Sequence, residues 1–147
     1  METTFIKTIL LVDDDLDDQD YFREALRIVD PSITLYTAKD GINAIEQLEK
    51  ITPDIILLDL NMPRMNGVEC LRELKKSEEL SDIPVIIYSA FLCTYDRNEV
   101  VSMGVRQFIK KEISFKDTVN TIRQALRMAV AERDVASNEA GQPEIAA

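Results

Sequence analysis

Residues 53–67 read PDIILLDLNMPRMNG, and this stretch decides the fold. It contains a strand-sized run over residues 54–58 that is apolar from Ile55 onward and is followed at once by Asp59. Residues 9–12 read ILLV and have the same character. Strands that are apolar at every position, without alternation, are typical of a parallel sheet with helices on both faces.

Outward from this stretch, short apolar runs alternate with helical periodicity. The strand-like runs are residues 8–12, 33–37, 54–58, 84–88 and 107–109. Amphipathic stretches separate them, with apolar faces such as Ile42, Ile45 and Leu48 or Phe115, Val119, Ile122, Leu126 and Ala129. The stretch around 94–103 is the least regular. Five such units in about 125 residues predict an α/β fold, a doubly wound five-stranded parallel sheet with right-handed crossovers.

The composition excludes several classes of function. The 147 residues include 17 Lys and Arg against 27 Asp and Glu, which gives a net charge of −10. This balance argues against nucleic acid or an anionic membrane surface as the main partner. The chain has no histidine, so Ser-His-Asp and Cys-His catalysis, His-ligated zinc and a phosphohistidine on this chain are all excluded.

Cysteine content and segment lengths indicate the environment. Cys70 and Cys93 are too few for a disulfide framework, and Cys70 lies in an apolar-periodic stretch where we expect it to be buried. We see no membrane-length apolar run and no secretory signal, so we expect a cytoplasmic protein. We expect one domain over 5–130 and a tail over 131–147, a helical extension that frays into disorder because the apolar periodicity ends.

Polar side chains follow four of the five predicted strands. In strand order they are Asp13, Asp14 and Asp15, then Asp59 and Asn61, then Ser89, and finally Lys110 and Lys111. The carboxyl ends of parallel strands meet at one edge of a sheet, so we expect these groups to converge. Clustered carboxylates repel each other, and Mg²⁺ relieves that repulsion. A carboxylate flanked by Mg²⁺ and an ammonium can attack phosphorus and become an aspartyl phosphate.

Each residue also has a simpler interpretation. The acids at 13–15 could cap the first helix and interact with its dipole. Ser89 alone is an ordinary strand-end hydroxyl, and strand alternation lets only one of the two lysines point inward. We interpret Asp17, Asp18 and Asp20 as first-turn or solvated helix residues without a chemical role. The joint occurrence at four strand ends favours the functional interpretation.

Residues 7–128 resemble the receiver domain of two-component response regulators, of the chemotaxis type and as a stand-alone single domain. The run LLVDDD resembles the family's acidic pair and places it at Asp13 and Asp14. In PDIILLDLNMPRMNG, Met-Pro stands three and four residues after Asp59 and Gly67 follows, which resembles the stretch around the phospho-accepting aspartate. The run VIIYSA places the family's hydroxyl at Ser89.

The segment GVRQFIKKEISF resembles the family's strand-five motif. The family places an aromatic residue four positions after the glycine and a lysine seven after it. Counted from Gly104 these are Phe108 and Lys111, so the spacing favours Lys111 over Lys110. The resemblance implies the flavodoxin-like strand order 2-1-3-4-5.

The resemblance also implies a mechanism. Mg²⁺ is held by the side chains of Asp13, Asp14 and Asp59 and by the backbone carbonyl of Asn61. Asp59 accepts a phosphoryl group from a partner sensor histidine kinase or histidine phosphotransfer protein. Lys111 and Ser89 then contact that group. Movement of Ser89 lets Phe108 turn, which remodels the face formed by the fourth helix, fifth strand and fifth helix for an unknown downstream partner.

Three positions depart from the family pattern or qualify it. Glu112 stands where the family usually has proline, so we expect a trans peptide there, since a cis bond before a non-proline residue costs about 2.5–4 kcal/mol. Phe108 lacks the hydroxyl of the tyrosine that is common at its position. Phe91, two residues beyond Ser89, cannot orient an attacking water, and this predicts slow self-dephosphorylation.

Two other functions compete with a phospho-accepting signalling protein that is not a turnover enzyme. A binding scaffold could keep the fold without using phosphorylation. A Mg²⁺-dependent phosphohydrolase could use Asp59 as its nucleophile, but such enzymes often need a second acid two residues on, where this chain has Asn61. Homodimer formation is left open by the sequence.

Overall fold

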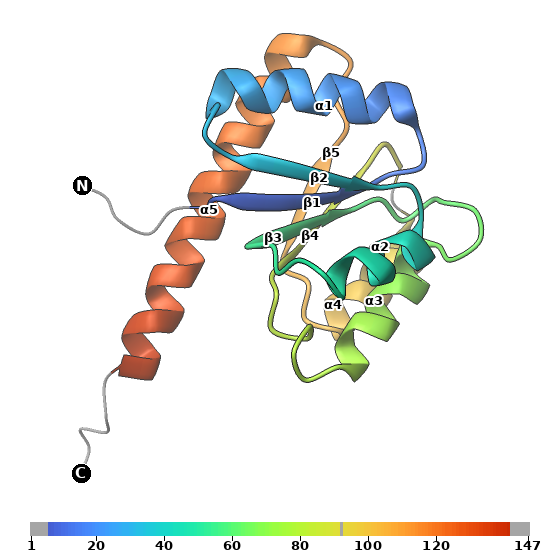
Figure 1. The fold of residues 1–147 in the computed structure, drawn as a ribbon, viewed down its shortest axis with the longest axis vertical. Coiled ribbons are helices and arrows are strands. Elements are labelled where there is room, and N and C mark those ends of the chain that lie inside the picture. Colours follow the sequence, from blue (N-terminus) through green and yellow to red (C-terminus); the bar gives the residue numbers. More distant parts are fainter. Residues whose placement is uncertain (1–5, 92, 142–147) are drawn as a thin grey trace.

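A computed structural model, which describes residues 6–91 and 93–141, contains five parallel strands in one sheet of order β2-β1-β3-β4-β5 (Figure 1). The strands are β1 Thr8–Val12, β2 Thr34–Ala38, β3 Ile55–Leu58, β4 Val85–Ser89 and β5 Gln107–Lys110. The helices are α1 Leu16–Val29, α2 Gly41–Leu48, α3 Gly67–Lys76, α4 Thr94–Ser102 and α5 Phe115–Gly141. The predicted α/β fold and strand order are confirmed.

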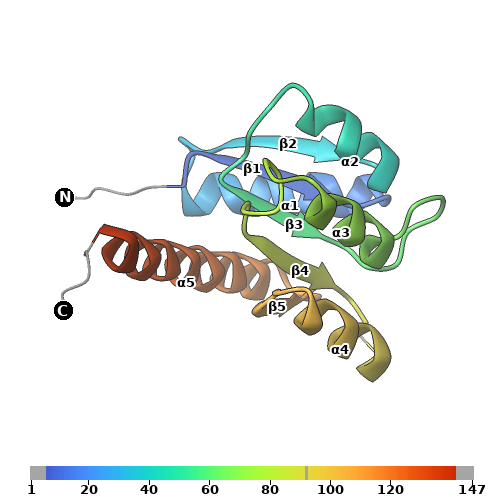
Figure 2. The same cartoon turned by 90° about the horizontal axis from the view of Figure 1, so that it is seen from below.

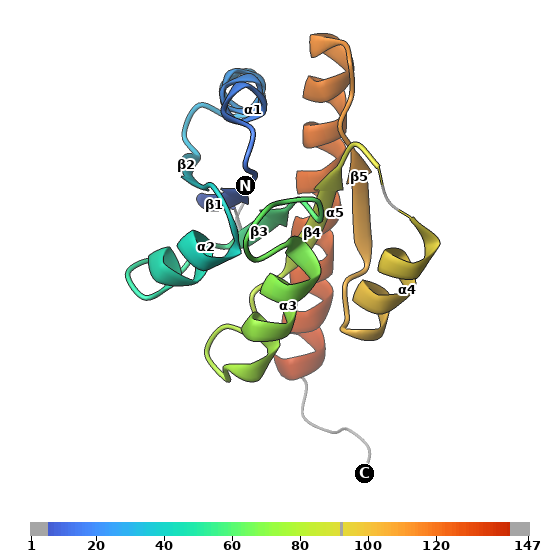
Figure 3. The ribbon, with the colours of Figure 1, turned by 90° about the vertical axis from the view of Figure 1, so that its right-hand side faces the viewer.

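The sheet separates two hydrophobic cores. Along β1, Ile9 and Leu11 face the core beneath α1 and α5, whereas Leu10 and Val12 face the core beneath α2, α3 and α4. Figure 3 shows α1 on one side of the sheet and α2 and α3 on the other. All four of these β1 residues are fully buried, which explains why the strand is apolar throughout rather than alternating.

The second helix buries most of its predicted face, since Leu48 is buried and Ile45 packs against the core, but Ile42 departs from the prediction. Asp40 caps α2 by accepting a hydrogen bond from the backbone N–H of Asn43, and this sets the start of the helix at Gly41. The buried positions are then Gly41, Ala44 and Leu48, whereas Ile42 stays exposed. Strand ends also differ from the predicted runs by about one residue, as is usual for element boundaries.

Cys70 lies in the core beneath α3, as predicted. Burial, followed by the nearby charge of Glu73, raises the pKa of its thiol to about 12. The thiol therefore stays protonated at neutral pH, and Cys70 acts as a small apolar side chain.

Helix α5 continues past the sheet as far as Gly141, and Figure 2 shows it projecting beyond the strands. The chain after residue 130 is therefore helical as far as Gly141. The tail over 131–147 is predicted to fray into disorder. Its residues 142–147 and the predicted domain start at residue 5 lie outside the described residues. The division into 5–130 and 131–147 stays a prediction. Within the described ranges, no helix combines the length and apolarity that crossing a membrane requires.

Candidate functional site

The three consecutive aspartates that follow β1 differ in their contacts and burial. Asp15 caps α1, because its side chain accepts hydrogen bonds from the backbone N–H groups of Asp17 and Asp18. The capping alternative therefore applies to Asp15. Asp13 is fully buried, its Oδ1 accepting from the backbone N–H of Asp15 at 3.0 Å, whereas Asp14 is exposed.

Asp59 follows β3 and is also buried. Its backbone N–H continues the sheet by donating to Val12 O at 3.0 Å, and its Oδ1 accepts from the backbone N–H of Asn61 at 3.0 Å. The start of α3 packs against this turn, where a Cβ at Gly67 would lie 2.4 Å from Asp59 O and 2.6 Å from Leu60 Cα. Only glycine fits there, so the Gly67 predicted from the motif serves the close approach of α3 to the Asp59 turn.

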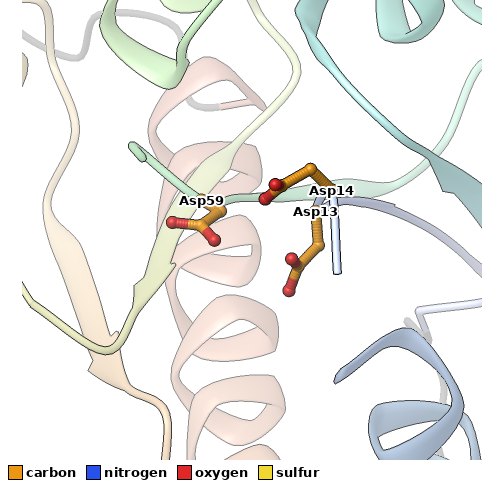
Figure 4. A group of neighbouring side chains, drawn as sticks. All are labelled: Asp13, Asp14 and Asp59. Atoms are coloured by element: carbon orange, nitrogen blue, oxygen red, sulfur yellow. The ribbon is translucent and has the colours of Figure 1, made fainter. Parts of the chain in front are cut away.

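Asp13, Asp14 and Asp59 lie side by side at the ends of β1 and β3 (Figure 4). One carboxylate oxygen from each lies within 4.8 Å of the other two. Desolvation by burial raises the pKa of Asp13 above its ordinary value, and the neighbouring Lys111 ammonium opposes that rise. Clustered, partly desolvated carboxylate oxygens suit a hard divalent cation. The hydrogen bond from Asn61 places that residue beside the cluster as well.

Lys111 supplies the positive charge of the site. Its backbone N–H donates to Ser89 O at 3.1 Å, and its Nζ lies 2.7 Å from Asp13 Oδ2 and 3.0 Å from Asp59 Oδ2. Burial alone would lower the pKa of the ammonium, but hydrogen bonds to the surrounding carboxylates raise it above the ordinary value. The structure brings Lys111 to the acids, whereas Lys110 is exposed.

Ser89, at the end of β4, is buried against Asp59. Its Oγ lies 3.2 Å from Asp59 Oδ1 and 2.9 Å from Phe91 O. A hydroxyl has a single proton, so Ser89 can donate a hydrogen bond to only one of these two oxygens at a time. Asn61 Nδ2 bridges the same groups, lying 3.3 Å from Ser89 Oγ and 3.2 Å from Phe91 O.

Phe108 lies outside this cluster, on β5. Its ring is half-buried and covered by the guanidinium of Arg97 from α4, whose Cζ lies 4.2 Å from the ring centroid. Phe91 is largely exposed beside the site, with its backbone carbonyl turned toward Ser89 and Asn61. The Phe108 ring on β5 is therefore in contact with α4 through Arg97.

Asp18 lies in the first turn of α1, as predicted, and it also makes a contact that the sequence did not indicate. Asp18 Oδ2 lies 2.9 Å from Lys111 Nζ. With Asp15 as the cap, Asp18 falls in the first turn of α1, which begins at the same sheet edge as the acids. The side chain of Asn61 was expected at this edge, but its contacts with Ser89 Oγ and Phe91 O were not.

Known proteins are similar to this chain over most of its length. Residues 9–123 match the family model described as the response regulator receiver domain. The polar-differentiation response regulator DivK of Brucella ovis is 29% identical over 120 residues, covering 82% of this chain and 96% of DivK. The hybrid signal transduction histidine kinase D of Dictyostelium discoideum is 32% identical over 97 residues, which are 66% of this chain but span only 6% of the kinase.

Solved structures agree in fold. The phosphorylated cyanobacterial phytochrome response regulator RcpA is 28% identical, with a TM-score of 0.77 over 86% of this chain and 96% of RcpA. The Mn²⁺-bound response regulator Rcp1 is 29% identical, with a TM-score of 0.71 over 80% of this chain and 90% of Rcp1. The chemotaxis protein CheY4 of Vibrio cholerae, at 22% identity and a TM-score of 0.70 over 82% of this chain and 98% of CheY4, shares the fold.

Proposed function

The chain belongs to the response regulator receiver family of two-component signalling, and from that premise we propose that it accepts a phosphoryl group on Asp59. The donor is a phosphohistidine on a sensor histidine kinase or a histidine phosphotransfer protein, since this chain has no histidine of its own. The observation that carries the proposal is the surroundings of Asp59. Its buried carboxylate has an ammonium on one oxygen, a hydroxyl and an amide N–H on the other, and two further acids beside it.

The donor set of the site fits Mg²⁺. Asp13, Asp14 and Asp59 would hold the ion with the backbone carbonyl of Asn61, because oxygen ligands and few protein contacts suit this cation. When bound, the ion neutralises charge on the carboxylates and on the oxygens of the transferring group. The Mn²⁺-bound state of the similar Rcp1 supports a divalent cation here.

The side chains around Asp59 support phosphoryl acceptance. As Asp59 forms its bond to phosphorus, the bond from phosphorus to the donor's imidazole nitrogen breaks and that nitrogen keeps the electron pair. Lys111 already contacts Asp59 and neutralises developing negative charge. Ser89 can turn its hydroxyl from Phe91 O to an oxygen of the new phosphoryl group. The phosphorylated state of the similar RcpA supports this use of the site.

Phosphorylation would then be read on the face formed by α4, β5 and α5. A shift of Ser89 toward the phosphoryl group removes its contact with Phe91 O, at the start of the connection to α4. Phe108 on β5 can turn only by leaving its contact with Arg97 on α4. The added charge thus biases two arrangements of one face, which a downstream protein distinguishes.

The test is incubation with acetyl phosphate and Mg²⁺ followed by intact-mass measurement. We expect the gain of one phosphoryl group that is stable in acid and labile in base. No gain in the folded protein would favour a scaffold that acts without phosphorylation. Rapid turnover of phosphate esters would favour a hydrolase instead.

A further inference from the structure

Two side chains of α1, one helical turn apart, reach across to the loop between β5 and α5. Asp18 Oδ2 lies 2.9 Å from Lys111 Nζ. Tyr21 donates its hydroxyl hydrogen bond to Ile113 O at 3.0 Å. Residues three apart on a helix share one face, so the two contacts act from the same side of α1. Together, Asp18 and Tyr21 join α1 to this loop.

The contact of Asp18 completes the surroundings of the Lys111 ammonium. Nζ carries three N–H donors and lies within 3.0 Å of three carboxylates, those of Asp13, Asp18 and Asp59. The Lys111 side chain is 14% exposed, and that of Asp18 is 40% exposed. Lysine has a long flexible side chain with high rotamer entropy. A fixed position for its ammonium therefore depends on all of the acceptors around it.

Tyr21 holds the backbone that follows Lys111. Its ring meets Phe115 edge-on, with centroids 5.5 Å apart. Ile113 is almost fully exposed, so its side chain does not anchor the loop in a core. Glu112 and Ile113 also lack the fixed φ that a proline would impose. The contacts of Tyr21 are accordingly a main restraint on this loop.

We propose that Asp18 is a positioning residue that holds the Lys111 ammonium beside Asp59, with Tyr21 supporting it through the loop. This inference rests on the proposed function, because its consequence is faster phosphoryl acceptance. Asp13 and Asp59 both take part in the reacting site. Asp18 does not take part in the reaction. Its contact with the Lys111 ammonium is therefore the same before and after the phosphoryl group is transferred.

The charge of Asp18 also slows phosphoryl acceptance to some extent, since any carboxylate at this edge repels an anionic phosphodonor. That repulsion acts through solvent and is weak for exposed groups. Asp17 stands one residue earlier in the same helical turn and is exposed. An Asp17→Asn variant therefore measures the effect of the charge alone. We expect the loss of the ammonium contact to outweigh it.

The test is the rate of phosphorylation of the full chain by acetyl phosphate with Mg²⁺, in a double-mutant cycle. We expect Asp18→Asn to slow the reaction about five- to tenfold, Asp18→Glu to restore part of the rate, and Asp17→Asn to change it less than about twofold. In the Lys111→Met background, Asp18→Asn should change the rate less than about twofold. Equal effects of Asp17→Asn and Asp18→Asn, or the same factor in both backgrounds, would overturn the proposal.

A second variant tests the loop support. Tyr21→Phe keeps the ring against Phe115 and removes only the hydroxyl, so amides of residues 111–114 should exchange hydrogen faster and phosphorylation should slow about twofold. Tyr36→Phe, on the exposed side of β2, is the matched control and should change neither. Unchanged exchange in Tyr21→Phe would refute the role of Tyr21.

Failure of the proposed function gives a different pattern. If the wild type takes up no phosphoryl group, phosphoryl acceptance on Asp59 is refuted, and with it the effect on rate. The same cycle is then measured on urea unfolding, where the effects of Asp18→Asn and Lys111→Met should be non-additive because the two side chains contact each other. Additive effects would refute the hold of Asp18 on Lys111 as well.

Discussion

Lys111 Nζ lies 2.7 Å from Oδ2 of the fully buried Asp13. One ammonium thus partly neutralises a cluster in which the carboxylates of Asp13, Asp14 and Asp59 lie within 4.8 Å of one another. Crowded and partly desolvated acids oppose folding, so we expect the burial of Asp13 in this cluster to cost stability. Added positive charge should reduce the repulsion between these carboxylates.

Replacing Asp13 by asparagine should therefore stabilise the folded protein in the absence of divalent cations. Burial raises the pKa of Asp13 above 3.8, so folding favours its neutral form. We expect the free energy of unfolding at pH 7 to rise by about 1 kcal/mol in Asp13→Asn. Urea unfolding measures this change, with Asp15→Asn as the control, since asparagine caps a helix about as well as aspartate.

The gain in stability of Asp13→Asn over the wild type should increase as the pH rises. Because the folded pKa is raised, the destabilisation by the wild-type Asp13 grows as the pH rises through 3.8 toward the folded pKa. Below 3.8 both states of the wild type are protonated, and the two proteins should converge. A variant that is less stable than wild type at neutral pH would contradict this account.

Gly67→Ala should disturb both stability and the site. An added Cβ would meet Asp59 O at 2.4 Å and Leu60 Cα at 2.6 Å, and both atoms belong to backbone. We expect a loss of about 1–3 kcal/mol in the free energy of unfolding, against the small gain that alanine usually brings to a helix. Glu73→Ala, on the exposed face of α3, should change it by less than about 0.5 kcal/mol in the same urea titration. A stabilised Gly67→Ala would show that α3 does not depend on this close approach.

Arg97→Ala should make the protein easier to switch. The guanidinium lies 4.2 Å from the Phe108 ring centroid, a contact worth about 0.5–1 kcal/mol at an exposed site. Its loss lowers the cost of turning Phe108, so acetyl phosphate should phosphorylate the variant about two- to fivefold faster. Arg106→Ala, an exposed change of the same charge just before β5, serves as the control. A rate equal to that of the control would exclude Arg97 as a restraint on Phe108.

Phe91 should prolong the phosphorylated state. The residue is 69% exposed beside Ser89, and its side chain offers no group to orient a water molecule. A carboxylate there could do so, and we expect Phe91→Glu to shorten the aspartyl-phosphate lifetime by roughly tenfold. Phe91→Leu keeps an apolar side chain and should leave the lifetime unchanged. Similar lifetimes for the Glu and Leu variants would rule out this explanation.

The residues that gather at the strand ends could be predicted from the sequence. Apolar runs define the strands, and parallel strands bring their carboxyl ends to one edge, so Asp13, Asp59 and Ser89 were expected to meet. Spacing from Gly104 selected Lys111, and the structure brings that lysine to the acids. The convergence of the strand ends depends on the periodicity of the strands, whereas the choice of Lys111 over Lys110 depends on the spacing that the resemblance to the receiver family supplies.

Contacts made across helices and loops could not be predicted in the same way. Asp18 meets Lys111 because Asp15 sets the start of α1 one turn earlier. Asp40 sets α2 so that Ile42 is exposed although it was expected in the apolar face. The stacking of Arg97 on Phe108 depends on the position of α4, the helix with the least regular apolar pattern. A shift of one residue in any of these helix starts changes which side chains meet.

The central claim is that Asp59 carries the phosphoryl group, and the most direct measurement is to locate that group. The protein is incubated with acetyl phosphate and Mg²⁺, the acyl phosphate is converted to a stable adduct with hydroxylamine, and the adduct is assigned by peptide fragmentation. Asp82, an exposed aspartate in the loop before β4, provides the matched control variant. We predict one adduct at Asp59, present in Asp82→Asn and absent in Asp59→Asn. An adduct at another residue, or one that survives Asp59→Asn, would contradict the claim.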